Sequence, residues 1–204
     1  METLKSFFVI EGEVNGEQIL KNLERYGRVC YKSEDKITSD SARKFVATIL
    51  KSGHESVIEH EKITVRVICD RGVTHEIVRH RIASYSQEST RYCNYKSRGI
   101  QVIEPFFFIG DDKKYQIWLT AMRACEDAYS ALVEAGATPQ EARSVLPNSL
   151  KTEIVITYNL REWRHFFRLR CSKRAHPQMR EVAVPILREF KKNIPIIFDD
   201  ILEE

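Results

Sequence analysis

The sequence lacks any apolar run long enough to cross a membrane. Its longer runs, such as Phe106-Phe107-Phe108-Ile109, extend over only a few residues, whereas a membrane-spanning helix needs about 20. Residues 1–6 do not show the basic segment and the long apolar stretch of a signal peptide. We therefore expect a cytoplasmic protein without a membrane partner.

Cysteine pairs and glycine-rich loops are also missing. The cysteines are odd in number, widely spaced and without a CxxC pair, which argues against a zinc ribbon and a disulfide framework. We expect free thiols at Cys30, Cys69, Cys93, Cys125 and Cys171. Neither GxGxxG nor a P-loop pattern occurs, so nucleotide binding cannot be inferred from a glycine loop.

The chain has little net charge, +3 over 204 residues, so a long polyanion is not the expected partner. Positive charge is nevertheless concentrated between Arg161 and Arg180, where Glu162 is the single acid. The end of the chain, residues 199–204, is acidic. A local basic cluster in a nearly neutral chain favours small anionic ligands over nucleic acid.

Hydrophobic periodicity predicts strands separated by helices. Strands are expected over residues 6–14, 61–69 and 152–158, and residues 82–92 are expected to be irregular. Helices are expected over residues 16–26, 41–52, 74–80 and 111–134, after the N-cap residues Thr138 and Asn159, and over 177–192. The strands are few and alternate apolar with polar residues. We therefore predict a mixed α/β fold of the α+β class, with a central, mostly antiparallel sheet and packed helices, in a single domain over residues 1–204.

The segment from Arg79 to Arg91 carries the residues best suited to ligand chemistry. It begins with Arg-His-Arg, continues with hydroxyl and amide side chains, and ends on another arginine. Arginine suits phosphate and carboxylate because its guanidinium donates two parallel hydrogen bonds. Taken alone, the segment fits a solvated basic helix end with a polar loop as well as it fits a binding site.

The spacing of Arg79-His80-Arg81, seven further residues and then Ser89 resembles the signature of the flavin-dependent thymidylate synthases. Arg91-Tyr92 also fits this resemblance. Three more segments resemble the same family: His54-Glu55-Ser56 with Glu59-His60, Ala142–Pro147, and Asn159 and Arg161 with Leu169-Arg170, His176 and Gln178. Together these segments extend over most of the chain.

The resemblance implies an activity and a fold. Members of this family convert dUMP to dTMP with methylenetetrahydrofolate as one-carbon donor, FAD as redox carrier and NADPH as reductant. Their fold is a mixed α/β arrangement of its own, and they form homotetramers whose sites combine several chains. The expected partners are therefore dUMP, folate, NADPH and further copies of the chain, with no metal and no nucleic acid.

The resemblance also implies which residues form the site. FAD is expected to contact Ser56, Arg79, His80, Arg81, Gln87, Asn159, Arg161 and His165. The substrates are expected to contact His54, Glu76, Ile77, Val78, Arg79, Gln87, Glu88, Ser89, Thr90, Arg91, Arg143 and Arg170. Arg170 is the expected catalytic residue, because an arginine beside uracil stabilises negative charge on the ring. No cysteine nucleophile is expected, and a nucleophilic role of Ser89 is disfavoured because no base is paired with it.

Several residues depart from the family pattern. Glu76 stands where many members have glutamine, and Gln87-Glu88 stands where others have an acid followed by an apolar residue. His165 replaces an asparagine of some members. An acid near a phosphate is unfavourable unless a neighbouring cation neutralises it, so these changes affect details of ligand contact.

Two other functions remain open at this point. The basic segment with Trp163, Phe166 and Phe167 is compatible with stacking on single-stranded nucleic acid, although core packing or the lining of a pocket also accounts for these aromatics. A flavoprotein with an unrelated redox function is the second alternative. A metal site at His54 and His60 is disfavoured, because their spacing is not that of HExxH zinc proteins.

Overall fold

The computed structural model describes residues 1–96 and 99–203, so that Glu204, part of the acidic chain end, lies outside the described residues. The chain divides into two compact units, each assembled from separate segments. The first unit comprises Met1–Phe8, Arg66–Arg79 and Tyr85–Val155, and the second comprises Val9–Val65, His80–Ser84 and the chain from Ile156 onward. The single domain expected from the sequence stays a prediction.

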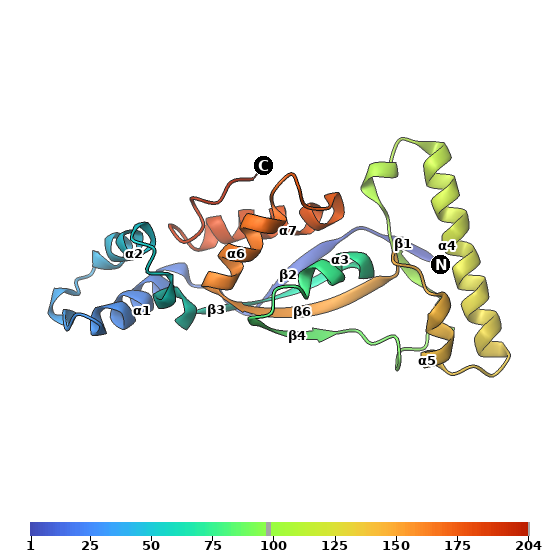
Figure 1. Cartoon of the computed structure of the whole chain (residues 1–204), viewed down its shortest axis with the longest axis horizontal. Coiled ribbons are helices and arrows are strands. Elements are labelled where there is room, and N and C mark those ends of the chain that lie inside the picture. The colour runs from blue at the N-terminus through green and yellow to red at the C-terminus, as the bar shows by residue number, and fades with distance from the viewer. Residues whose placement is uncertain (97–98, 204) are drawn as a thin grey trace. The chain divides into compact units, whose positions relative to one another are not determined.

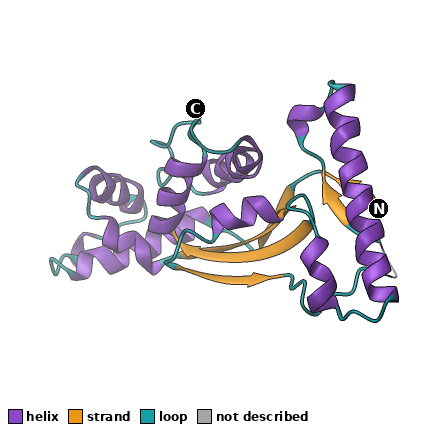
Figure 2. Ribbon diagram, turned by 45° about the vertical axis from the view of Figure 1, so that its right-hand side comes forward, coloured by secondary structure: helices purple, strands orange, loops and turns teal. Residues whose placement is uncertain are grey.

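The main sheet has four strands in the order β2 (Phe7–Glu11), β3 (Lys62–Asp70), β6 (Lys151–Asn159) and β4 (Ala83–Gln87). Thr64 on β3 hydrogen-bonds to Thr157 on β6, and Arg66 reaches Glu153, so residue numbers rise along β3 as they fall along β6. The strands of this sheet lie side by side with alternating direction (Figure 1, Figure 2). This confirms the predicted fold class. A separate pair, β1 (Glu2–Leu4) and β5 (Gln101–Ile103), is parallel.

An aromatic core holds the second unit together. Its helices are α1 (Gly16–Val29), α2 (Ser41–Lys51), α6 (Leu160–Arg170), α7 (Pro177–Asn193) and the 3-10 helices η1 (Glu34–Lys36) and η2 (Glu55–His60). Trp163 stacks on Phe167 with ring centroids 5.4 Å apart, and Phe190 and Phe198 pack edge-on against Phe167. The indole N–H of Trp163 donates to the carbonyl oxygen of Ile63 at 3.1 Å, so its polar group is satisfied.

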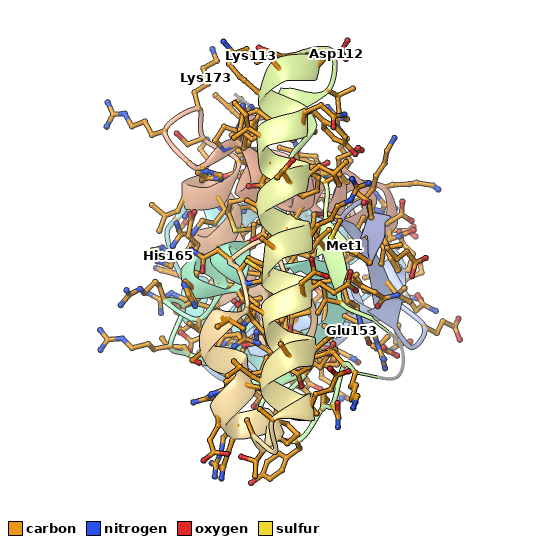
Figure 3. All side chains as sticks on the ribbon, turned by 90° about the vertical axis from the view of Figure 1, so that its right-hand side faces the viewer. Met1, Asp112, Lys113, Glu153, His165 and Lys173 are labelled. Atoms are coloured by element: carbon orange, nitrogen blue, oxygen red, sulfur yellow. The ribbon has the colours of Figure 1, made fainter. Side chains whose placement is uncertain are left out.

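The long helix α4 (Asp112–Glu134) supplies much of the core of the first unit. The other helices of this unit are α3 (Arg71–Ile77), α5 (Pro139–Ala142), η3 (Phe106–Phe108) and η4 (Arg143–Val145). Trp118 and Met122 of α4 pack with Ile100, Val102 and Leu150. Figure 3 shows the whole length of α4, with Asp112 and Lys113 at its first turn. The Met1 ammonium group forms an ion pair with Glu126 of this helix at 2.8 Å.

Two local predictions around the Arg-His-Arg motif are wrong. Residues 83–87 form strand β4 rather than irregular chain, because an edge strand with an incompletely buried face needs no apolar alternation. The helix before the motif runs over Arg71–Ile77 rather than 74–80. Its N-cap is Asp70, whose Oδ1 accepts from the Val73 N–H at 2.7 Å, whereas the Thr74 hydroxyl donates to the Arg71 carbonyl oxygen.

Gly27 does not end helix α1, which continues to Val29. A Cβ at this position would lie 2.7 Å from ring atoms of Phe45, so the glycine is required by close packing and not by a turn. Pro185 lies inside α7 without ending it. Across the described residues, no helix combines the length and the apolar character needed to cross a bilayer.

Truncation of the aromatic core should cost a large part of the stability. Phe167 is fully buried, so Phe167→Ala should lower the free energy of unfolding by about 3–5 kcal/mol, measured by urea denaturation. Leu169→Ala on the same helix is the control, because Leu169 is 48% exposed and its removal should change stability by less than about 0.5 kcal/mol. Equal effects of the two variants would contradict this account of the core.

Candidate active site

The candidate site residues fall into two sets, one in each unit. The first unit contains Glu76, Ile77, Val78, Arg79, Gln87, Glu88, Ser89, Thr90, Arg91 and Arg143. The second contains His54, Ser56, His80, Arg81, Asn159, Arg161, His165 and Arg170. The Arg-His-Arg motif is itself divided, since Arg79 belongs to the first unit and its next two residues belong to the second.

Asn159 positions Arg161, His165 and Arg170 of the second set, because strand β6 passes directly into helix α6 at this residue. Its Oδ1 accepts from the Glu162 N–H at 2.8 Å and so caps the helix, as its sequence position predicts. A pocket of about 430 Å³ opens beside this first turn. It is lined by Glu55, Glu59, Ile82, Asn159, Arg161, Glu162, His165 and Arg168.

Carboxylates neutralise the arginines of this pocket. The Arg161 guanidinium forms an ion pair with Glu59 at 2.6 Å and lies 3.7 Å from Glu55. Glu55 also accepts from Arg164 at 3.3 Å. The sequence assigns neither glutamate a site role, although both belong to a segment that resembles the family. Their negative charge, complementary to the basic segment 161–180, is the feature from which this pairing could have been predicted. His54 and Ser56 are exposed beside them.

His80 lies buried between Glu162 and Arg170, with 3% of its surface exposed. Its Nδ1 is 2.9 Å from the Glu162 carboxylate, and its Nε2 is 3.2 Å from Nε of Arg170. The rings of Tyr158, His165 and Phe166 pack around it, with centroids between 5.1 and 6.0 Å away. His80 therefore contacts the residue expected to be catalytic. Its expected contact with FAD stays a prediction.

The surroundings of His80 keep its ring neutral. Burial, with the nearby positive charge of Arg170 and of His165, lowers the pKa of His80 from 6.5 to about 4. Burial also raises the pKa of Glu162, an effect that His165 partly offsets. An arginine beside a histidine discourages a second positive charge, so the ring serves as a hydrogen-bonding group at neutral pH.

His80, Glu162 and His165 present ligand atoms within 4.8 Å of one another, which is compatible with a metal ion. The Arg170 guanidinium has no acceptor atom, so its Nε–H must donate to His80 Nε2. That bond occupies the lone pair that a metal would need, and the other ring nitrogen carries the hydrogen facing Glu162. This geometry favours the orientation of an arginine over metal binding.

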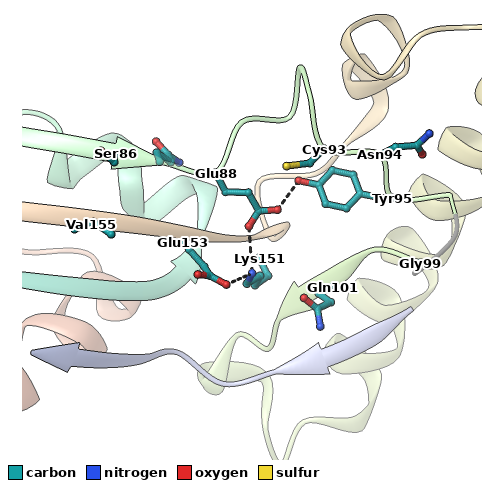
Figure 4. Close-up of a pocket in the computed structure, with 11 residues that line it drawn as sticks. Ser86, Glu88, Cys93, Asn94, Tyr95, Gly99, Gln101, Lys151, Glu153 and Val155 are labelled. Carbon is teal, nitrogen blue, oxygen red and sulfur yellow. Dashed lines mark hydrogen bonds and ion pairs between the residues drawn. The ribbon is translucent and has the colours of Figure 1, made fainter. Parts of the chain in front are cut away.

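The first unit contains a larger pocket, of about 690 Å³, beside the segment after the motif (Figure 4). Glu88 lies at its centre, where it accepts from the Tyr95 hydroxyl at 2.8 Å and from Lys151 Nζ at 3.1 Å. Lys151 also donates to Glu153 at 2.7 Å. The acid that departs from the family pattern is thus neutralised by a lysine, which sequence reasoning missed because the two residues are 63 positions apart. Cys93 lines the same pocket.

The remaining residues of the first set have different degrees of exposure. The Gln87 amide donates to the hydroxyls of Thr74 and Thr152 at 3.1 and 3.3 Å. Ile77 is fully buried and Thr90 nearly so. Side chains that solvent reaches belong to Val78, Arg79, Arg91 and Arg143. Glu76 is half-buried, and Ser89 accepts from the Arg91 N–H at 3.3 Å.

The cysteines are free thiols, as expected. Cys69 and Cys171 are buried, and burial raises the pKa of the Cys171 thiol to about 12. Burial likewise raises the pKa of Cys69. Neither is a thiolate at neutral pH, so neither is a ready nucleophile.

Comparisons with known proteins identify relatives. Residues 16–196 match the family described as "Thymidylate synthase complementing protein". A flavin-dependent thymidylate synthase of Geobacter sulfurreducens is 41% identical over 180 residues, which cover 85% of this chain and 78% of that protein. One from Pyrococcus furiosus is 36% identical over 170 residues, which cover 82% of this chain and 70% of that protein.

A solved structure shares the fold. The UMP/dUMP methylase PolB from Streptomyces cacaoi, bound with 5-Br dUMP, has a TM-score of 0.81 over 98% of this chain and 96% of that chain. The sequences are 22% identical, so the likeness concerns the fold alone. It supports the predicted mixed α/β arrangement.

The neutral state of His80 should give stability a specific pH dependence. Below pH 6.5 the unfolded chain takes up a proton at this residue, whereas the folded chain does so only near pH 4. The stability that depends on neutral His80 is therefore complete above pH 6.5 and lost as the pH falls toward 4. Urea denaturation across this range measures the loss.

His80→Gln is the comparison, because glutamine does not titrate. The raised pKa of Glu162 acts in the opposite direction in both proteins, so the difference between the two curves isolates His80. Parallel curves for the two proteins across this range would contradict the lowered pKa.

Proposed function

This chain belongs to the thymidylate synthase complementing protein family, the flavin-dependent thymidylate synthases, and we propose that it methylates dUMP to dTMP with methylenetetrahydrofolate, FAD and NADPH. The observation that carries the proposal is the Arg170 guanidinium held by the buried, neutral His80 of the Arg-His-Arg motif. This contact links the arginine proposed to act on uracil to the histidine of the motif that resembles the family signature.

Arg170 performs the central electrostatic step in this proposal. Carbon C5 of uracil becomes nucleophilic when negative charge develops on the ring, and a fixed guanidinium beside the ring stabilises that charge. His80 accepts from Nε of Arg170, and the planar guanidinium also carries terminal N–H donors of the kind that suit the oxygens of the base. This role needs no cysteine addition to the ring.

The pocket of the second unit fits the proposed flavin nucleotide. Arg161 and Arg168 are half-exposed, so their guanidinium groups can turn from Glu59 and Glu55 toward a phosphate. Ile82, 68% exposed, adds an apolar surface suited to an aromatic heterocycle. When bound, FAD would carry reducing equivalents from NADPH to the new methyl group. We propose that other chains of a homotetramer complete this pocket and contribute to folate binding.

The first unit supplies the proposed contacts to the phosphate of dUMP. Exposed Arg91 and Arg143 suit its phosphate, and the Ser89 hydroxyl is a neighbouring donor. Glu88 does not repel the phosphate as an isolated acid would, because Lys151 and the Tyr95 hydroxyl both donate to it. The family departure at residues 87 and 88 is thus compensated within the same unit.

The oligonucleotide-binding alternative loses its main support. Trp163, Phe166 and Phe167 are each no more than 1% exposed, so none of them presents a ring face for stacking on a base. An unrelated flavoprotein function makes a different prediction, since it would bind flavin without making dTMP.

Arg170→Ala should lower kcat for dTMP formation by at least about 100-fold, because the guanidinium that stabilises the developing charge is lost. The assay contains dUMP, methylenetetrahydrofolate, FAD and NADPH at low oxygen, and dTMP is quantified by chromatography. Arg174→Ala is the matched control, an exposed arginine on the neighbouring segment, and it should keep activity. Near-normal turnover of Arg170→Ala would exclude its proposed role.

The wild-type protein separates the rival functions in the same experiment. A purified protein with a flavin absorption spectrum that makes dTMP supports the proposal. A yellow protein that makes no dTMP would favour another redox function, and a colourless protein that cannot be reconstituted with FAD would contradict flavin dependence.

Cys93→Ser tests the absence of a cysteine nucleophile, because Cys93 lines the same pocket as Gln87 and Glu88, two of the residues expected to contact the substrates. We expect kcat within about threefold of the wild type, since removal of a covalent nucleophile typically costs far more, on the order of 10⁴-fold or greater. Loss of activity on that larger scale, with dUMP binding retained in equilibrium dialysis, would contradict the proposed mechanism.

A further inference from the structure

Glu162 is a buried carboxylate without a role in the proposed reaction. It lies in the first turn of α6, with 7% of its surface exposed. Its backbone N–H is already bonded to Asn159, so the side chain is not needed to begin the helix. Burying a carboxylate is costly unless it is hydrogen-bonded, and the contact at 2.9 Å joins Oε1 to Nδ1 of His80.

The direction of each hydrogen bond in this group follows from the chemistry of arginine. Guanidinium nitrogens only donate, so Arg170 Nε–H donates and His80 Nε2 accepts. A neutral imidazole has one N–H, which must then lie on Nδ1, where it donates to Glu162. The carboxylate is therefore the group that selects the tautomer in which Nε2 can receive the arginine.

The packing around His80 fixes the orientation of its ring, so the feature that can change is which ring nitrogen carries the hydrogen. Its ring lies against Tyr158, His165 and Phe166, so reorientation of the imidazole would disturb the aromatic core. Without an acceptor at Nδ1, the hydrogen can move to Nε2. Two donors would then face each other where Arg170 and His80 now bond, and this hydrogen bond to the guanidinium would be lost.

We infer that Glu162 is a positioning residue that fixes Arg170 for the reaction by holding His80 in its Nδ1–H tautomer. The inference rests on the proposed function, because Arg170 is the residue whose position matters. It adds to that function a residue outside the Arg-His-Arg motif and 82 positions from its histidine.

The first test needs no activity. Protein labelled with ¹⁵N at histidine shows by NMR which ring nitrogen carries hydrogen, and the His80 signal is assigned by its loss in His80→Gln. We expect the Nδ1–H tautomer in the wild type and the Nε2–H tautomer in Glu162→Leu. An Nε2–H tautomer in the wild type would overturn the inference, even if Glu162→Leu fails to fold.

The second test measures turnover. Glu162→Leu removes the acceptor and should lower kcat at least about tenfold, with a smaller change in KM for dUMP. Glu162→Gln retains an acceptor oxygen, so it should keep the Nδ1–H tautomer and a kcat within about threefold of the wild type. Equal impairment of the two variants, or normal kcat in folded Glu162→Leu, would overturn the positioning role.

Glu24 provides a matched control for burial. It is a glutamate 1% exposed on α1, paired with Arg28 at 2.7 Å, and it belongs to the same unit. Glu24→Leu should lower the melting temperature without altering the His80 signal or kcat, and an equal loss of kcat would show that any buried glutamate has this effect. If the wild type makes no dTMP, the proposed function fails, while the NMR arm still decides the tautomer.

Discussion

The direct passage from strand β6 into helix α6 at Asn159 is the constraint on which the second unit depends. No loop residue separates the two elements: Asn159 is the last residue of the strand and also the N-cap of the helix, where its Oδ1 accepts from the Glu162 N–H. The start of the helix therefore determines which way each of its two faces points. One face sends Trp163, Phe166 and Phe167 into the aromatic core, and the other presents Arg161 and His165 to a pocket.

Charge pairing within the chain is a second general feature of both pockets. Arg161 is paired with Glu59, and Lys151 is paired with Glu88 and Glu153. An anion that binds at Arg161 or Lys151 must therefore displace a carboxylate, so its affinity at these residues reflects a difference between two ion pairs.

The sequence predicted well the features that depend on local patterns. The alternation around Ile63 and the cap residues Thr138 and Asn159 correctly placed strands and helices. The polar edge strand at residues 83–87 was missed because its neighbours, rather than its own periodicity, make it a strand. Glu162 and Lys151 were missed for a related reason, since each acts on a partner that lies far away along the chain. The family resemblance identified His80 but not the direction of its hydrogen bonds.

The hydrogen bonds of His80 have a consequence for divergence among homologous proteins. His80 donates to Glu162 through one ring nitrogen and accepts from Arg170 through the other, so a substitution of one partner affects the hydrogen bond to the other. A lineage that replaces Glu162 must supply a new acceptor at Nδ1, from water, backbone or another side chain, before it can retain the arginine contact. Substitutions at positions 80, 162 and 170 should accordingly be inherited as compatible sets, and a chain that combines the motif histidine with a non-accepting residue at 162 marks a branch that orients its arginine by other means.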